Sequence, residues 1–291
     1  MKGLVTFSHA KMLHFSYTPT TSSFSPNKTP NFHHSLSSSP HPSLFLKFRT
    51  SHRENLRYLK SIGIINPETK VHKIPSPETL VRIISTVNFL KSKGFSELDF
   101  PRLAYLCPNL FSPEFDLAVI ELVFDFLASD LAASPEESRG LILRCPHILE
   151  SNVEFCLRPT LNYLRNLGLE NLNSPTTLNA HLLDTRVEKL REKVRFLRSV
   201  GFSYEESARI CARLPAIFGY STENNLRPKF EYLVGEMMRD VEELKRFPQY
   251  FAFSLEKRIA PRHLHLKQRS VRIPLKRMLL WSDQRFYAKW K

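Results

Sequence analysis

The segment RCPHILE, at residues 144–150, places a cysteine, a proline and a histidine side by side. Thiolate and imidazole groups are the ligands that zinc prefers, and a cysteine of low pKa can act as a nucleophile. Related segments are LCPNLF at 106–111, RLPAIF at 213–218 and RFPQYF at 246–251, and they share the proline but not the cysteine-histidine pair. We therefore interpret RCPHILE as one copy of a structural repeat.

No other part of the sequence carries a pattern typical of catalysis. There is no nucleophile elbow, no glycine loop for phosphate and no HExxH motif. His263 and His265 have no third ligand at a recognisable spacing, and the four cysteines form no CxxC pair, which favours structural thiols over a zinc site or a disulfide framework. We expect a protein that is not an enzyme and that has no metal and no cofactor.

Glycine, serine and proline divide the chain into short helices. LKSIG (59–63), LKSKG (90–94), LRNLG (164–168) and LRSVG (197–201) each place a glycine after a helical pattern, as expected for the left-handed residue that follows a helix. Serines such as Ser134 and Ser203, each with a glutamate three residues later, begin the next helices. The repeated proline must end the helix that precedes it, because it disfavours helical geometry in its predecessor.

The spacing of the prolines defines a repeat. They stand at 108, 146, 215 and 248, and the interval from 146 to 215 is about twice the others. A hidden unit is therefore expected at NAHLL, 179–183, with Asn179 in the position of the proline. A second proline follows 13 residues after the first, at 159, 228 and 261. A period of this length predicts an all-α helical-repeat solenoid.

Basic residues are concentrated at the ends of the chain. The 291 residues include 42 Lys or Arg and 28 Asp or Glu, a formal net charge of +14. Residues 54–256 are nearly neutral, whereas 257–291 contain a single acid, Asp283, among many basic residues. This excess indicates an anionic partner. No membrane span is expected, because the most apolar stretch, 117–128, is short and contains two acids.

The first 53 residues have the composition of a targeting segment. They are rich in Ser, Thr and Pro, contain no acid and lack the apolar run of a secretory signal. We interpret residues 1–53 as a disordered transit peptide and 54–291 as the folded domain, with 257–291 as a basic closing segment. The absence of arginine before Arg49 favours the chloroplast over the mitochondrion. The alternative is a disordered tail without a targeting role.

The repeat and the C-terminal sequence together resemble the mitochondrial transcription termination factor (mTERF) family, in its plant organellar branch. The resemblance rests on the proline-x-x-apolar turns, the F/Y-L-x-x-x-G helix ends and the closing sequences FSLEKRIAPRHLHL and IPLKRMLLWSDQRFYAKW. It runs from about Leu56 to the C-terminus. Three departures are the missing proline at Asn179, the missing glycine at Leu131 and a shifted glycine at Gly235.

The resemblance implies a fold and a function. The fold is a superhelix of roughly six three-helix units, two helices of each being longer and one short. The function is binding of organellar double-stranded DNA in transcription termination, with RNA binding in rRNA or mRNA maturation or intron splicing as the alternative. We expect a monomer, without a membrane, that binds DNA and/or RNA of the organelle and works beside organellar transcription or processing proteins.

Two repeat positions, counted from the proline, carry cations. Position +12 holds Arg158, Arg191 and Arg227, and position +14 holds Lys193, Lys229 and Arg262. Equivalent positions in a solenoid lie roughly 10 Å apart, so such cations would form a stripe that follows a phosphate backbone. With the basic segment 186–198 and the tail, the predicted nucleic-acid-binding residues are Arg158, Arg191, Lys193, Arg195, Arg198, Arg227, Lys229, Lys257, Arg258, Arg262, Lys267 and Arg269.

Two alternatives compete with this interpretation. The charges of 186–198 also suit a solvated helix face stabilised by Glu–Lys and Glu–Arg pairs. A protein-binding scaffold would suit the neutral middle of the chain. Among the aromatic residues of the tail, base stacking is less favoured than closure of the last repeat, because a solenoid must cover its open end; these residues are Trp281, Phe286, Tyr287 and Trp290.

Overall fold

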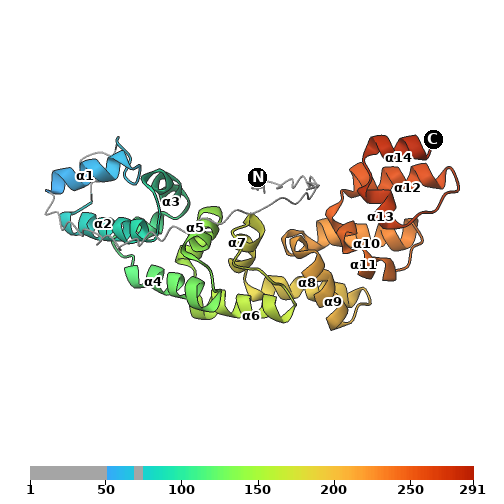
Figure 1. The fold of residues 1–291 in the computed structure, drawn as a ribbon, viewed down its shortest axis with the longest axis horizontal. Coiled ribbons are helices and arrows are strands. Elements are labelled where there is room, and N and C mark those ends of the chain that lie inside the picture. The colour runs from blue at the N-terminus through green and yellow to red at the C-terminus, as the bar shows by residue number, and fades with distance from the viewer. Residues whose placement is uncertain (1–50, 69–74) are drawn as a thin grey trace, which may run out of the picture. The chain divides into compact units, whose positions relative to one another are not determined.

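The computed structural model describes residues 51–68 and 75–291, which form helices and turns and no strand (Figure 1). The predicted transit peptide lies almost entirely outside the described residues, and the first helix begins at His52. None of the helices in these two ranges combines the length and the apolar composition of a membrane span. The helices are α1 (His52–Ser61), α2 (Pro77–Ser92), α3 (Phe100–Leu106), α4 (Leu117–Asp125), α5 (Pro135–Arg144), α6 (Arg158–Asn166), α7 (Thr177–Leu183), α8 (Val187–Ser199), α9 (Tyr204–Arg213), α10 (Arg227–Glu231), α11 (Glu242–Arg246), α12 (Ala260–Lys267), α13 (Leu275–Leu280) and α14 (Asp283–Lys289).

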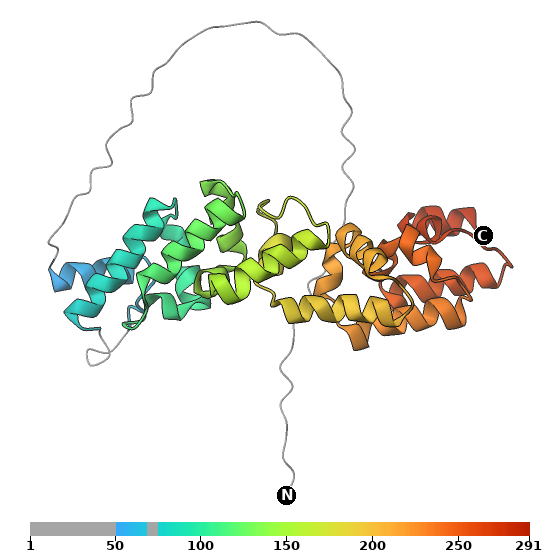
Figure 2. The same cartoon turned by 90° about the horizontal axis from the view of Figure 1, so that it is seen from below.

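The repeat unit consists of two helices joined by one turn of 3₁₀ helix. These turns are η3 (Pro108–Phe111), η5 (Pro146–Glu150), η7 (Pro215–Gly219) and η10 (Pro248–Ala252), and a further 3₁₀ turn, η2 (Glu97–Asp99), precedes α3. Turn η3 packs against η5, and η7 packs against η10, so units that are adjacent in sequence are adjacent in space (Figures 1 and 2). The predicted all-α helical-repeat fold is confirmed.

The first proline of each unit ends one helix and begins the 3₁₀ turn, as predicted. The residue before it has a φ near −137° and lies outside helical geometry, as seen at Cys145, Leu214 and Phe247. Two residues after the proline, an apolar or aromatic side chain is buried in the core, namely Leu110, Ile148, Ile217 and Tyr250.

The second proline changes the hydrogen bonding of the helical turn that precedes it. Without an N–H group it cannot bond to the carbonyl four residues earlier, and its ring displaces that carbonyl. The preceding turn instead has bonds spanning five residues, such as Leu157 N to Asn152 O at 3.1 Å, and is π-helical. This applies to η6 (Val153–Leu157), η8 (Thr222–Leu226) and η11 (Leu255–Ile259), whereas α4 and α8, which lack this proline, begin as ordinary α-helices.

Four predicted helix stops are confirmed, with φ of 73°, 88°, 82° and 106° at Gly63, Gly94, Gly168 and Gly201. Where no such glycine follows the helix, Ala132, Met238 and Ser270 adopt the left-handed conformation, with φ of 55°, 48° and 54°. Ala132 and Met238 follow the π-helical segments η4 (Phe126–Asp130) and η9 (Tyr232–Glu236), and Ser270 follows α12. The expectation that Gly235 is the shifted stop is wrong, because Gly235 lies within η9.

The hidden unit is present in a shortened form. Without a proline at Asn179, α7 continues through this residue, and no 3₁₀ turn separates it from α8. The Asn179 amide donates to the carbonyl oxygens of Asn171, at 2.9 Å, and Ser174, at 3.0 Å, and so stabilises the loop before α7. Helix α7 packs against α5, α6 and η7, which is the place of a full unit.

Helices α13 and α14 close the C-terminal end of the array. Phe286 is completely buried, while Trp281 and Trp290 are half-buried against the core. Closure by these aromatic side chains was the favoured prediction. All four cysteines are unpaired, and Cys107, Cys145 and Cys211 are buried.

Candidate nucleic-acid interface

The side chains at position +14 are buried between consecutive units. Lys193, Lys229 and Arg262 are 8%, 5% and 1% exposed. Lys193 Nζ donates to Thr222 Oγ1 at 3.1 Å, and Lys229 Nζ donates to the carbonyl oxygen of Phe251 at 2.7 Å. Arg262 likewise donates to main-chain carbonyls of the closing segment. Position +14 is therefore a polar link from each unit to the next.

An uncharged residue makes the same link one unit earlier. Thr160, also at position +14, is buried and donates from Oγ1 to the carbonyl oxygen of Thr185 at 2.9 Å. The feature shared by this position is thus a hydrogen-bond donor and not a positive charge. Burial of the ammonium group lowers the pKa of Lys193, and it lowers that of Lys229 to about 8.

These observations correct the prediction that Lys193, Lys229 and Arg262 line an exposed stripe. Two residues of α-helix rotate a side chain by about 200°, so position +14 faces the neighbouring unit when position +12 faces solvent. A phosphate group could reach Lys229 and Arg262 only if the units separated, whereas Lys193 belongs to the lining of the hollow described below.

The arginines at position +12 lie at least partly on the surface, and two of them, Arg191 and Arg227, are in register. The guanidinium group of Arg191 lies 5.6 Å from the ring centroid of Tyr163, and that of Arg227 lies 5.7 Å from that of Phe196. Tyr163 and Phe196 occupy the same position of the preceding unit, five residues after its own arginine. The same cation–π contact is therefore repeated, and it directs both arginines to the same side of the array.

Two of these arginines also have acidic partners. Arg158 pairs with Asp130, at 3.0 Å, and with Glu154, while Arg227 donates two hydrogen bonds to Glu223. The pairs with Glu154 and Glu223 are exposed to solvent and contribute little to stability, whereas Asp130 accepts two partly buried hydrogen bonds from Arg158. Among the described residues Arg191 has no carboxylate partner, so its guanidinium group is available to a ligand.

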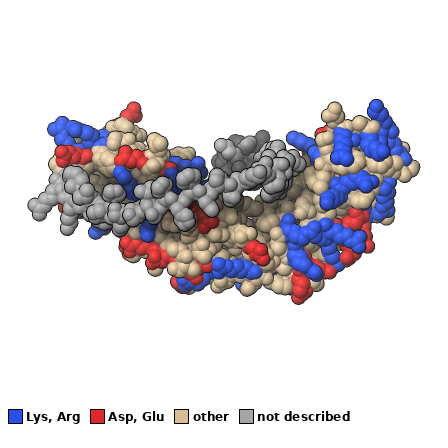
Figure 3. Space-filling model, viewed as in Figure 1, with Lys and Arg blue, Asp and Glu red and all other residues tan. Residues whose placement is uncertain are grey.

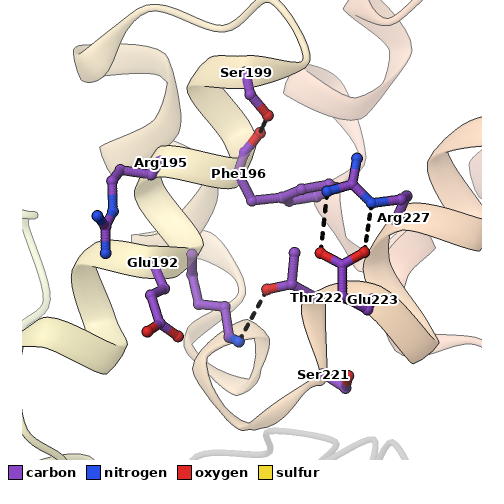
Figure 4. A pocket seen from close by; sticks show the side chains of 9 residues that line it. Glu192, Arg195, Phe196, Ser199, Ser221, Thr222, Glu223 and Arg227 are labelled. Atoms are coloured by element: carbon purple, nitrogen blue, oxygen red, sulfur yellow. Dashed lines mark hydrogen bonds and ion pairs between the residues drawn. The ribbon is translucent and has the colours of Figure 1, made fainter.

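Helix α8 adds two exposed arginines, of which Arg195 borders an open hollow. Arg195 and Arg198 are exposed and have no hydrogen bond or ion pair within the described parts of the chain. The hollow has a volume of about 560 Å³ and lies between α8 and the start of η8 (Figure 4). Arg195 and Arg227 reach it from successive units. It is lined by Glu192, Lys193, Arg195, Phe196, Ser199, Ser221, Thr222, Glu223 and Arg227.

The donors of this hollow suit an anion. Ser199, Ser221 and Thr222 belong to its lining; the Ser199 hydroxyl donates to the carbonyl oxygen of Phe196 at 2.8 Å, and Ser221 caps the N-terminus of the helix that begins with η8. The positive end of a helix favours negative charge. Glu192 and Glu223 offset two of the three cations, so the hollow carries a small positive charge.

The predicted cations of the tail form two groups. Arg258 donates to the carbonyl oxygens of Leu279, at 2.9 Å, and Trp281, at 2.6 Å, and burial lowers its pKa. Together with Arg262, it holds the closing helices in place, which corrects its assignment to the binding surface. Lys257, Lys267 and Arg269 are exposed.

The structure also places exposed cations of the tail, among them Arg285, which the prediction left out, beside an aromatic side chain. Arg277 and Arg285 lie against the Trp281 ring, 5.9 and 4.3 Å from its centroid. Lysine and arginine side chains gather over the C-terminal elements on the face drawn in Figure 3. Alternation of aromatic and basic residues in LKRMLLWSDQRFYAKW was the signal that could have identified them.

Comparison with known proteins identifies the repeat. The model of the mTERF family matches residues 56–176 and 141–287. These ranges cover all the repeat units described above. The chain belongs to the mTERF family. The resemblance seen in the sequence is thereby confirmed.

The relatives of this mTERF chain are chloroplast proteins by name. Transcription termination factor MTERF2, chloroplastic, of Arabidopsis thaliana is 36% identical over 98 residues, which are 34% of this chain and 15% of the relative. MTERF4, chloroplastic, of Zea mays is 31% identical over 98 residues, 34% of this chain and 20% of the relative. MTERF8, chloroplastic, of Arabidopsis thaliana is 27% identical over 203 residues, which are 69% of this chain and 40% of the relative.

The chain spans well under half the length of these three relatives. Their names support the chloroplast as the location of this chain.

Proposed function

We propose that this mTERF protein binds chloroplast double-stranded DNA and acts in transcription termination. The observation that carries the proposal is the register of Arg191 and Arg227, which the repeated arginine–aromatic contact directs to one side. The names of the relatives, all transcription termination factors, support the same function. The proposed surface comprises Arg158, Arg191, Arg195, Arg198 and Arg227, continued by Lys257, Lys267 and Arg269.

Electrostatics explains how this surface would bind. Each arginine that neutralises a phosphate releases condensed counterions, so affinity falls as the salt concentration rises. To bind phosphate, Arg158 must release Asp130 and Glu154, and Arg227 must release Glu223, whereas Arg191 is free to bind directly. Arg191 is therefore expected to contribute most among the three.

RNA maturation is the second candidate, and one side chain favours it. Phe155 is 85% exposed and lies one helical turn before Arg158. An exposed aromatic ring beside an arginine is a stacking platform for an unpaired base. A duplex would not use this ring, so Phe155→Ala separates the two nucleic acids.

The experiment compares the full chain with two triple variants of equal charge change. The first, called the row variant because it changes the row of arginines at position +12, is Arg158/Arg191/Arg227→Gln. The control is Arg57/Arg102/Arg209→Gln, which changes three exposed arginines outside this row. Both are measured against chloroplast DNA fragments and transcripts across a range of salt concentrations. For duplex DNA the row variant should reduce the magnitude of the slope of log K against log salt by about 2 to 3, because each lost arginine–phosphate contact reduces it by about 0.9.

The outcomes are distinct. Duplex binding that is lost only in the row variant supports the proposal. Preferential RNA binding that weakens in Phe155→Ala transfers the assignment to transcript maturation. Equal binding by the row variant and its control would remove the +12 row from the interface, and a protein partner would then be the better hypothesis.

A further inference from the structure

Two consecutive 3₁₀ turns bring three potential metal ligands together. Turns η3 and η5 pack against each other. Cys107 Sγ, at the start of η3, lies 3.5 Å from His147 Nδ1 of η5. These two atoms and a carboxylate oxygen of Glu150 all lie within 4.8 Å of one another. The cluster thus joins LCPNLF to RCPHILE, the segments with which the sequence raised the question of metal binding.

The distances suit a tetrahedral zinc ion. Zinc binds cysteine sulfur at about 2.3 Å and histidine nitrogen at about 2.0–2.1 Å, so two such ligands at the tetrahedral angle are roughly 3.5 Å apart. This is the separation found between Cys107 and His147. The carboxylate would close on the ion by rotation of the half-buried Glu150 side chain. His147 is exposed, so a fourth position opens to solvent and suits a water molecule.

Glu150 supplies an independent observation. Its Oε1 atom is buried, yet it has no hydrogen-bond partner within the described residues. A buried acceptor without a partner is costly, and burial accordingly raises the pKa of this carboxyl group. A cation between Glu150, Cys107 and His147 would satisfy the oxygen.

The repeat itself does not require these side chains. In the later turns the residue before the proline is Leu214 or Phe247, and the residue after it is Ala216 or Gln249. A buried apolar side chain therefore suffices at the position of Cys107, and no imidazole is needed at that of His147. The combination of thiol, imidazole and carboxylate at this one junction calls for a separate explanation.

We propose that Cys107, His147 and Glu150 form a zinc site that fastens two consecutive repeat units. Burial raises the pKa of Cys107 to about 12, so the metal-free protein carries the thiol. On binding, the thiol proton passes to solvent and a Zn–S bond takes its place, with neutral His147 and ionised Glu150 as the other ligands. No spacing motif indicates the site, because its ligands come from segments about 40 residues apart.

The test uses the full chain, freed of metal with a chelator and titrated with Co²⁺, which reports thiolate ligation by a charge-transfer absorption. One equivalent of Co²⁺ should generate this band, and Zn²⁺ should displace it and raise the midpoint of thermal unfolding. His147→Asn and Glu150→Gln should each weaken binding at least about tenfold, as even the loss of a ligand's supporting partner does. Cys107→Ala should abolish the band.

Matched controls are Cys211→Ala, another buried thiol, and His181→Asn, another exposed histidine. Both should retain the band and the affinity. The proposal is overturned if no band forms at one equivalent, if the band survives in Cys107→Ala, or if His147→Asn binds as tightly as His181→Asn. His147 is on the surface, so this last comparison remains decisive even where Cys107→Ala fails to fold. The result is independent of nucleic-acid binding.

Discussion

Replacing Lys229 by methionine tests the role of position +14 as a link between units. Lys229 Nζ donates to Asn225 Oδ1 and to the carbonyl oxygen of Phe251, both at 2.7 Å. Its folded-state pKa is about 8, against an ordinary value of about 10.4 in the unfolded chain. Methionine preserves the apolar stem and removes the charge and the donor.

The pH dependence of stability is the decisive quantity. Between about pH 8 and 10.4 the unfolded chain binds more protons at Lys229 than the folded chain, so the free energy of unfolding rises with pH. With these two pKa values, raising the pH from 7 to 9.5 adds about 2 kcal/mol through Lys229 alone. At any single pH the change in the free energy of unfolding caused by Lys229→Met is smaller than this pH-dependent change, because loss of the hydrogen bonds offsets removal of a buried charge.

The assay is urea unfolding at pH 7 and pH 9.5, followed by the fluorescence of Trp281 and Trp290 in the closing segment. The free energy of unfolding of the wild type should increase with pH by about 2 kcal/mol more than that of Lys229→Met. The control Lys257→Met, at an exposed lysine, should follow the wild type. Equal pH dependence in the wild type and Lys229→Met would refute the burial argument, and a loss of duplex affinity in this variant would return Lys229 to the binding surface.

Two further predictions concern stability at pH 7, measured by the same unfolding experiment. Met238→Gly should raise the free energy of unfolding by about 0.5–1 kcal/mol, because relief of the left-handed backbone strain exceeds the extra entropy of glycine and the lost methionine side chain is 73% exposed. Gly201→Ala, at φ 106° with open space around it, should lower the free energy of unfolding. A change of the same sign in both variants would contradict this explanation. Thr160→Val should lower the free energy of unfolding by about 1–3 kcal/mol, since the carbonyl of Thr185 loses its donor, whereas Thr177→Val, at a half-buried threonine in α7, should change it by less.

Local features of the fold could be predicted because they act over a few residues. A proline removes its own N–H group and constrains its predecessor, so the ends of α5, α9 and α11 follow from the sequence alone. Gly63, Gly94, Gly168 and Gly201 have the predicted positive φ for the same reason. At Ala132 and Met238 the prediction failed, because packing of the unit holds ordinary residues in a conformation that their side chains disfavour.

The candidate sites depended on neighbours that the sequence does not specify. The spacing of 12 and 14 residues from the proline identified two sets of cations, but it could not show which set faces the next unit. Likewise, Cys107 and His147 belong to different units, and only the packing of η3 on η5 brings their side chains together.

The sequence by itself determined the helical repeat, its period, the hidden unit at Asn179 and the charge of the ends, because these depend on backbone stereochemistry and composition. Only the tertiary structure decided which cations are exposed. Arg191 lies on the surface and Lys193, two residues later, is buried, because a helix turns by about 100° per residue and the following unit covers one side of it.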